Sequence, residues 1–181
     1  PPALHHCLNG TWYLRRAQWQ AREEYRRTVL SLPVQKVVIG HSAGSYCNRV
    51  YSCISIVLSI QEQHLRVYDD IGPNFLVGGE GLVFEGRGAN LVGVMVKGYN
   101  TRIISIMFLG NYNNDIPDDN QINNVSQLLD VLVRENVLRP DYEVLAQCQI
   151  NQSQSPGKNI RKIMQEFKNF NSSQLDTCPK Y

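Results

Sequence analysis

The side chains best suited to metal binding or nucleophilic chemistry gather in two short segments. One is VVIGHSAGSYC, residues 37–47, in which His41 follows a run of β-branched residues and a glycine. Imidazole serves as a metal ligand and as a general base, so His41 could be a ligand, a catalyst or a structural residue. The other is His5-His6-Cys7. This cluster has no matching second pair of ligands in the sequence, so we expect a terminal segment there and no metal site.

The cysteines and glycosylation triplets favour an oxidising, extracellular setting. Five cysteines are present, and Cys47 and Cys53 are close enough to staple a loop or a helix start. Asn-x-Ser/Thr triplets are acceptors for N-linked glycans in secreted proteins. They occur at Asn9, Asn124, Asn151 and Asn171. Cys148 has neither a base nor a cationic group near it in the sequence, so we do not expect a reactive thiol.

Composition indicates one globular domain without a preference for nucleic acid. A chain of 181 residues can bury a sizeable core. Its 18 basic and 16 acidic residues are spread along the sequence and give a net charge of +2, so no basic stripe that would grip a phosphate backbone stands out. Neither a signal peptide nor an apolar run of membrane-spanning length is present. We expect any membrane anchor to lie outside this fragment.

Strands and helices alternate along the chain. Apolar runs predict buried strands over 32–40, 103–110 and 142–147. Two shorter runs around Gly-Gly-Glu-Gly predict a hairpin over 74–86. Apolar residues at helical spacing predict three helices, over 47–65, after an N-cap at Asp118 or Asp119, and around Ile160, Ile163, Met164 and Phe167. We therefore expect an α/β domain, 1–181, with a central mixed sheet packed by about three main helices, an N-terminal segment over 1–14 and a C-terminal tail over 171–181.

Several motifs, in this order, resemble the peptidoglycan recognition protein family, which shares its fold with zinc amidases that cut between muramic acid and L-alanine. RRAQWQA (15–21) is similar to the family's Arg-x-x-Trp-x-Ala opening. PVQKVVIGHSAGSYCNRVYSC (33–53) resembles its strand, His-His-Thr-Ala turn and six-residue cysteine step. DIGPNFLVGGEGLVFEGRG (70–88) resembles its hairpin and Glu-Gly-Arg-Gly turn, and YNTRIISIMFLGNY and QSPG complete the series. The resemblance covers nearly the whole chain and implies a type 2 amidase-like fold.

The resemblance also implies that the catalytic metal site has been lost. The family's three zinc ligands are two histidines and a cysteine, and the matching positions are Gly40, Gln147 and Ser155. Glycine has no side chain to donate, and glutamine and serine are poor zinc ligands beside imidazole and thiolate. Pro73 stands where the family has a tyrosine near the reacting carbonyl. We therefore expect no amidase activity and no cofactor. His41 matches a histidine that is not a ligand, so we expect it to be a hydrogen-bonded structural residue.

The ligand groove of the family is retained only in part. Members that prefer diaminopimelate-type peptidoglycan carry an arginine in Glu-Gly-Arg-Gly, which pairs with the extra carboxylate, and Arg87 keeps that position. A guanidinium suits a carboxylate bidentately. His64 matches a groove histidine, whereas Val67-Tyr68 replaces the family's Gly-Trp pair. The resemblance thus implies His64, Tyr68 and Arg87 as candidate ligand-binding residues.

Other changes in the groove leave its function open. The family's tryptophan and histidine at two further groove positions are Ala89 and Met95 here. Arg87 is equally compatible with a scaffold role, in which it would pair with an acidic neighbour, namely Glu85, Asp69 or Asp70.

The cysteine pairing follows partly from the resemblance and partly from the chain ends. The family's disulfide implies Cys47 with Cys53. Of the remaining three, we prefer Cys7 with Cys178, because domain termini often lie close together, which leaves Cys148 in a strand. Cys7 with Cys148 is the alternative.

The resemblance implies a non-catalytic innate immune receptor of insect type that senses bacterial peptidoglycan. We expect the extracellular domain of a single-pass plasma membrane receptor, which docks as a co-receptor on a sister ectodomain carrying a monomeric diaminopimelate-type muropeptide. Tyr46, Arg49 and Tyr51 are candidate interface residues, because tyrosine and arginine are enriched at binding hot spots. One alternative is direct binding of such fragments in the chain's own groove. Another is a zinc amidase with substitute ligands.

Overall fold

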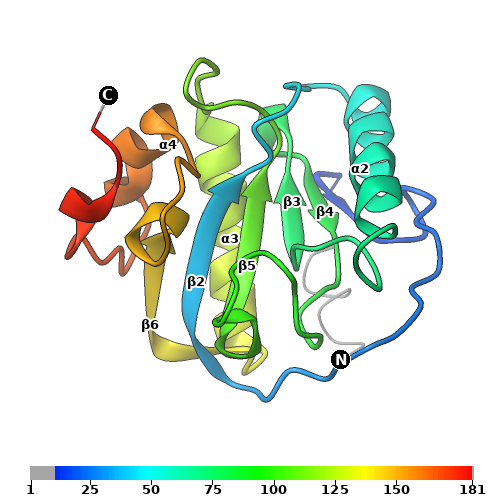
Figure 1. Cartoon of the computed structure of the whole chain (residues 1–181), viewed down its shortest axis with the longest axis horizontal. Helices are drawn as coiled ribbons and strands as arrows, with labels where there is room; N and C mark the ends of the chain where they lie inside the picture. The colour runs from blue at the N-terminus through cyan, green and yellow to red at the C-terminus, as the bar shows by residue number, and fades with distance from the viewer. Residues whose placement is uncertain (1–10, 181) are drawn as a thin grey trace.

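A mixed β-sheet forms the centre of the domain in the computed structural model, which describes residues 11–180. Its six strands lie in the order β1-β4-β3-β5-β2-β6 (Figure 1). Their bounds are β1 Tyr13–Leu14, β2 Val34–His41, β3 Phe75–Val77, β4 Val83–Glu85, β5 Ile103–Phe108 and β6 Leu138–Ala146. β3 and β4 are antiparallel, and the other neighbouring pairs are parallel. The expected mixed sheet is confirmed.

Within residues 11–180, three α-helices accompany the sheet. They are α2 Val50–His64, α3 Asp119–Arg134 and α4 Lys158–Ile163. α3 begins at the expected N-cap: Asp118 accepts a hydrogen bond from the backbone N–H of Gln121, and the Gln121 side chain accepts one from the backbone N–H of Asp118. This reciprocal pair satisfies two N–H groups that a helix start otherwise leaves unpaired.

The helices cover the sheet because alternate strand residues point to opposite faces. On one face, Val37, Ile106 and Val77 pack in the same apolar cluster as Leu128 and Leu132 of α3. On the other face, Leu76 and Phe84 share a second cluster with Trp19, Cys53 and Val57, the last two from α2. Figure 1 shows α3 behind β2 and β5, and α2 on the side of the domain where β3 and β4 lie. Within residues 11–180, no helix combines the length and apolar character that a membrane span requires.

The four cysteines of the described part of the chain form two disulfides, and one differs from our expectation. Cys47 and Cys53 are bonded, as the resemblance implied. The second bond joins Cys148 to Cys178, so the preferred pairing of Cys178 with Cys7 is wrong. Its physical reason is the return of the C-terminal segment along β6, where the backbone N–H groups of Val144 and Asn171 donate to the carbonyls of Asn169 and Val144. Cys7 lies outside the described residues.

Asn74 ties β5 to the loop that follows β4. The residue is fully buried, and its amide nitrogen Nδ2 donates to the carbonyls of Gly88 and Leu91 at 2.9 and 2.8 Å. Its Oδ1 accepts from both the backbone N–H and the hydroxyl of Ser105, each at 2.9 Å. All four hydrogen-bonding positions of the amide are therefore used.

We expect Asn74→Ala to lower the free energy of unfolding by about 3 kcal/mol, because several buried groups lose their partners at once. Urea denaturation monitored by circular dichroism measures the change. Asn120→Ala, at an exposed helical asparagine, is the matched control and should change it by less than about 0.5 kcal/mol. Equal effects of the two substitutions would contradict the assigned role of Asn74.

Candidate functional site

The candidate site is a groove at the carboxyl ends of the parallel strands β2, β5 and β6, where ligand sites of α/β sheets commonly lie. It has a volume of about 460 Å³. Its lining includes His41, His64, Tyr68, Met95, Gln147 and Ser155. These residues come from the end of β2, the end of α2, and the loops before β5 and after β6.

The three positions that match the family's zinc ligands lie together in the structure. A Cβ placed on Gly40 would be 2.7 Å from Oε1 of Gln147 and 2.9 Å from Oγ of Ser155. The Ser155 hydroxyl accepts a hydrogen bond from the backbone N–H of His41 at 2.9 Å. The Gln147 amide donates from Nε2 to the Met95 carbonyl at 3.2 Å. The neutral side chains of Gln147 and Ser155, hydrogen-bonded to the backbone, therefore occupy the space next to Gly40 that a ligand side chain would need.

This donor set does not fit a zinc ion. An amide oxygen and a hydroxyl are weak ligands for zinc, and Gly40 contributes nothing. In the part of the chain from 11 to 180, no group of three or more His, Cys, Asp or Glu side chains is arranged to hold a metal. We therefore derive no chemical step that involves a metal at this site.

The two groove histidines are held in the same tautomer. Nδ1 of His41 accepts from the backbone N–H of Tyr112 at 3.1 Å, and Nδ1 of His64 accepts from that of Gly72 at 2.8 Å. Each neutral ring therefore carries its proton on Nε2. His41 is hydrogen-bonded, as expected, although it also lines the groove. Burial lowers the pKa of both rings, and the positive charge of Arg87 lowers that of His64 further.

Tyr68 lines the groove, and its neighbour in the sequence, Val67, is exposed. The Tyr68 ring contacts His64 edge to face, with centroids 5.6 Å apart, and both residues line the groove. Val67 exposes 71% of its surface and Tyr68 exposes 42%. These two adjacent side chains give a small exposed apolar surface next to His64.

Arg87 has a structural role outside the groove, where it donates to backbone carbonyls. Its Nε donates to the carbonyl of Ile71 at 2.8 Å, and its other nitrogens donate to the carbonyls of Val92 and Asp70 at 3.2 and 3.4 Å. The side chain borders a separate hollow, which Arg16 and Asp70 also line, and is absent from the lining of the groove. The structure thus brings His64 and Tyr68 together and leaves Arg87 outside their site.

Sequence reasoning missed the amide-rich loop that follows β5. Asn111 and Asn113 line the groove, and Nδ2 of Asn113 donates to Oε1 of Gln154 at 3.1 Å. The available signal was the run GNYNND directly after a predicted central strand, because the carboxyl ends of parallel strands carry binding loops.

The acceptor asparagines differ in their surroundings. Nδ2 of Asn124, the atom to which a glycan is attached, donates to the Gly81 carbonyl at 2.9 Å. Oδ1 of Asn151 is buried without a hydrogen-bond partner in the described part of the chain. Asn171 is partly exposed, and its Oδ1 accepts from the backbone N–H of Ser173. Asn9 lies outside the described residues.

Comparisons with known proteins point to one family. Residues 30–158 match the N-acetylmuramoyl-L-alanine amidase family. Peptidoglycan-recognition protein SC2 of Drosophila melanogaster is 33% identical and covers 89% of each chain. A peptidoglycan recognition protein of Bombyx mori is 37% identical over 79% of this chain and 74% of its own.

Solved structures agree with this result. A chain in the complex of tracheal cytotoxin with the ectodomains of peptidoglycan recognition proteins LCa and LCx has a TM-score of 0.84 and 34% identity, over 88% of this chain and 98% of that one. Peptidoglycan recognition protein LE, bound to the same monomeric diaminopimelic acid-type peptidoglycan, has a TM-score of 0.81 and 30% identity, with the same coverage of 88% and 98%.

We expect the groove histidines to make stability depend on pH. In the unfolded chain a histidine takes up a proton near pH 6.5, whereas the folded rings, with lowered pKa, do so only at lower pH. The unfolded state therefore binds more protons as the pH falls through 6.5, and the free energy of unfolding decreases. Measured by urea denaturation between pH 7.5 and 5, this decrease should be smaller in His64→Asn. Identical decreases in the variant and the parent chain would contradict the assignment.

Proposed function

This chain belongs to the peptidoglycan recognition protein family, and we propose that it is a non-catalytic receptor ectodomain that acts as a co-receptor in sensing bacterial peptidoglycan. It would dock on a sister ectodomain that carries a monomeric diaminopimelate-type muropeptide. The observation that carries the proposal is the groove itself. The groove persists at the strand ends, but two positions that match zinc ligands carry neutral side chains hydrogen-bonded to the backbone. Arg87 donates to backbone carbonyls outside the groove.

The non-catalytic part of the proposal is supported by what a metal hydrolase requires. Such an enzyme must hold its ion and lower the pKa of a bound water. Gly40, Gln147 and Ser155 offer no imidazole or thiolate for that purpose, and Pro73 has no hydroxyl to assist at a carbonyl. A binding role needs none of these groups, so it is compatible with their loss.

The docking role is supported by what surrounds the groove. Tyr68 lines the groove and is 42% exposed, its neighbour in the sequence Val67 is 71% exposed, and Tyr51, at the start of α2, exposes 87% of its surface. Tyrosine contributes strongly to protein interfaces because it offers a large, rigid contact area. The solved complex with LCa and LCx unites two ectodomains of this family with tracheal cytotoxin. We propose a comparable arrangement here, with this chain in the place of the LCa form.

The proposal includes the cellular context. The domain would be the extracellular part of a single-pass plasma membrane receptor, with the membrane segment outside this sequence. Its two disulfides suit an oxidising compartment. Among the acceptor asparagines of the described chain, Asn171 is best placed to carry a glycan, because the amide of Asn124 is already engaged.

Direct muropeptide binding is the second candidate function. It is favoured by His64 and Tyr68, which share the groove and are oriented by hydrogen bonding and ring contact. The rings of His41 and His64 each carry an Nε2–H that could donate to a carbonyl or carboxylate of a ligand. In that case the isolated domain binds the muropeptide, and His64→Ala weakens the binding.

We expect no saturable binding when tracheal cytotoxin is titrated into the isolated domain in a calorimeter. With an LCx-type ectodomain present, the toxin should produce a heterodimer detectable by analytical ultracentrifugation, because the ligand then forms part of the interface. Tyr51→Ala should weaken this association, whereas Tyr25→Ala, at an exposed tyrosine of another loop, should not. Saturable binding to the isolated domain that is lost in His64→Ala would overturn the co-receptor role and establish direct binding.

We also expect the domain, purified without chelators, to contain far less than stoichiometric zinc by atomic emission analysis. The combined variant Gly40→His, Gln147→His and Ser155→Cys restores the family's ligand types at adjoining positions, and it should acquire zinc. This variant is the positive control, because its zinc content shows that the assay detects an occupied site. A stoichiometric zinc ion in the unaltered domain would refute the argument against catalysis.

A further inference from the structure

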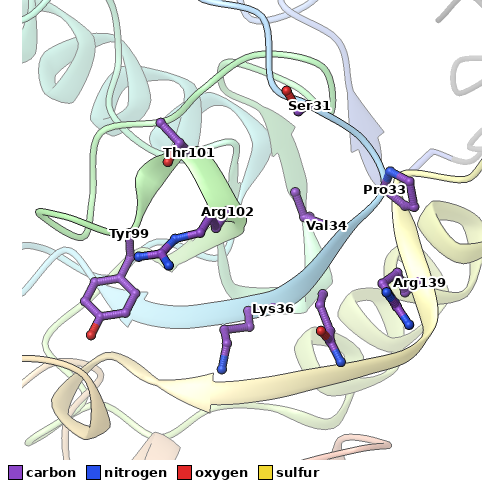
Figure 2. Close-up of a pocket in the computed structure, with 9 residues that line it drawn as sticks. Ser31, Pro33, Val34, Lys36, Tyr99, Thr101, Arg102 and Arg139 are labelled. Carbon is purple, nitrogen blue, oxygen red and sulfur yellow. The ribbon is translucent and has the colours of Figure 1, made fainter.

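A second hollow lies at the opposite end of the sheet from the groove. It has a volume of about 360 Å³, within the range of small-molecule pockets. Its walls come from the start of β2, the start of β6, and the turn 99–102 that leads into β5 (Figure 2). Because β2, β5 and β6 run parallel, this end is separated from the groove by the length of the strands.

The side chains of this pocket are cationic. Lys36, Arg102 and Arg139 line it, and no carboxylate is among its lining residues. Figure 2 shows Arg102 and Tyr99 on one side of the pocket, Arg139 on the other, and Lys36 on β2 between them. The three charges are therefore spread across the hollow, which suits a ligand with more than one anionic group.

An irregularity in the sheet places Arg139 there. Val34 of β2 pairs with Leu138 of β6, and the next pair is Lys36 with Glu143. Two steps along β2 thus correspond to five steps along β6. The additional residues of β6 leave the ladder and include Arg139. Bulges of this kind redirect side chains and are common beside functional sites.

The three cationic side chains can still bind a ligand. Lys36 pairs with Glu143 at 3.1 Å and Arg139 with Asp141 at 2.9 Å, but these side chains are 38–61% exposed. An exposed pair such as Lys36–Glu143 contributes little, so an anion can compete for Lys36. The Arg139–Asp141 pair is bidentate, with a second contact at 3.2 Å, but both side chains are exposed, so Arg139 keeps donors that face solvent. Arg102 has no ion pair within residues 11–180 and is held only by the Tyr99 ring, at 5.4 Å, and by the Gly98 carbonyl, at 3.3 Å.

We propose that this pocket binds a saccharide that carries phosphate or sulfate esters. Guanidinium and ammonium groups recognise tetrahedral oxyanions through charge-assisted hydrogen bonds. The hydroxyls of Ser31 and Thr101 and the ring of Tyr99 add polar and aromatic contacts for a sugar body. The site is independent of the groove, so it adds a second ligand class to the proposed receptor.

Two probes distinguish the ester types. Glucose 1,6-bisphosphate and a trisulfated heparin disaccharide are titrated into the domain, and backbone amide shifts are followed by NMR. At least one probe should bind saturably, shift the amides of 34–36 and 99–102, and leave those of the groove unchanged. The stronger probe identifies the ester. Added salt should weaken the binding, because charge interactions at an open site are screened.

Arg102→Gln and Arg139→Gln should each weaken the binding by about tenfold, because each removes a charge-assisted contact. Arg66→Gln, at an exposed arginine beyond α2, is the matched control and should leave it unchanged. Thermal unfolding confirms that all three variants are folded. The proposal fails if neither probe binds, if inorganic phosphate or sulfate binds as tightly as the probes, or if the three variants weaken binding equally.

Discussion

The buried amide of Asn74 is the interaction on which the arrangement of the groove depends. It fixes the carbonyls of Gly88 and Leu91, and thereby the loop that carries Arg87. Arg87 in turn holds the carbonyls of Asp70, Ile71 and Val92. Gly72 follows Ile71 in the sequence. Its backbone N–H donates to the ring of His64, and its carbonyl accepts from the backbone N–H of Val94 on the groove wall. The uncharged side chain of Asn74 thus positions the groove through the Arg87 guanidinium and the backbone groups that it holds.

Much of this fold was predictable because the responsible signals are local. The capping residues around Asp118 mark the start of α3, and apolar runs mark β2 and β5, so tertiary context only had to select what the sequence already favoured. The two-residue strand β1 has no periodicity to detect, since it exists through its pairing with β4. The partner of Cys148 depends on how the chain returns along β6, which no local pattern reveals.

In the candidate site, too, some features were predictable from residue types and others depended on the course of the main chain. Residue types at Gly40, Gln147 and Ser155 were enough to question a metal site, because ligand chemistry is a property of the side chain itself. The use of Arg87 was not predictable, because whether a guanidinium faces a ligand or the backbone depends on the path of the main chain around it. Asn113 was overlooked for a related reason: its place in the groove follows from a loop whose course is set by contacts with Gln154 and Lys158.

The disulfide between Cys148 and Cys178 also constrains the order in which the protein can mature. Cys47 meets its partner after 6 further residues, whereas Cys148 requires 30. At ordinary translation rates of about 5–20 residues per second, the second interval lasts several times longer than the first. Throughout that interval the thiol of Cys148 is unpaired while Cys7 is already synthesised. The bond between Cys148 and Cys178 can therefore close only after the C-terminal segment has been synthesised and has returned along β6, whereas the short loop can close much earlier.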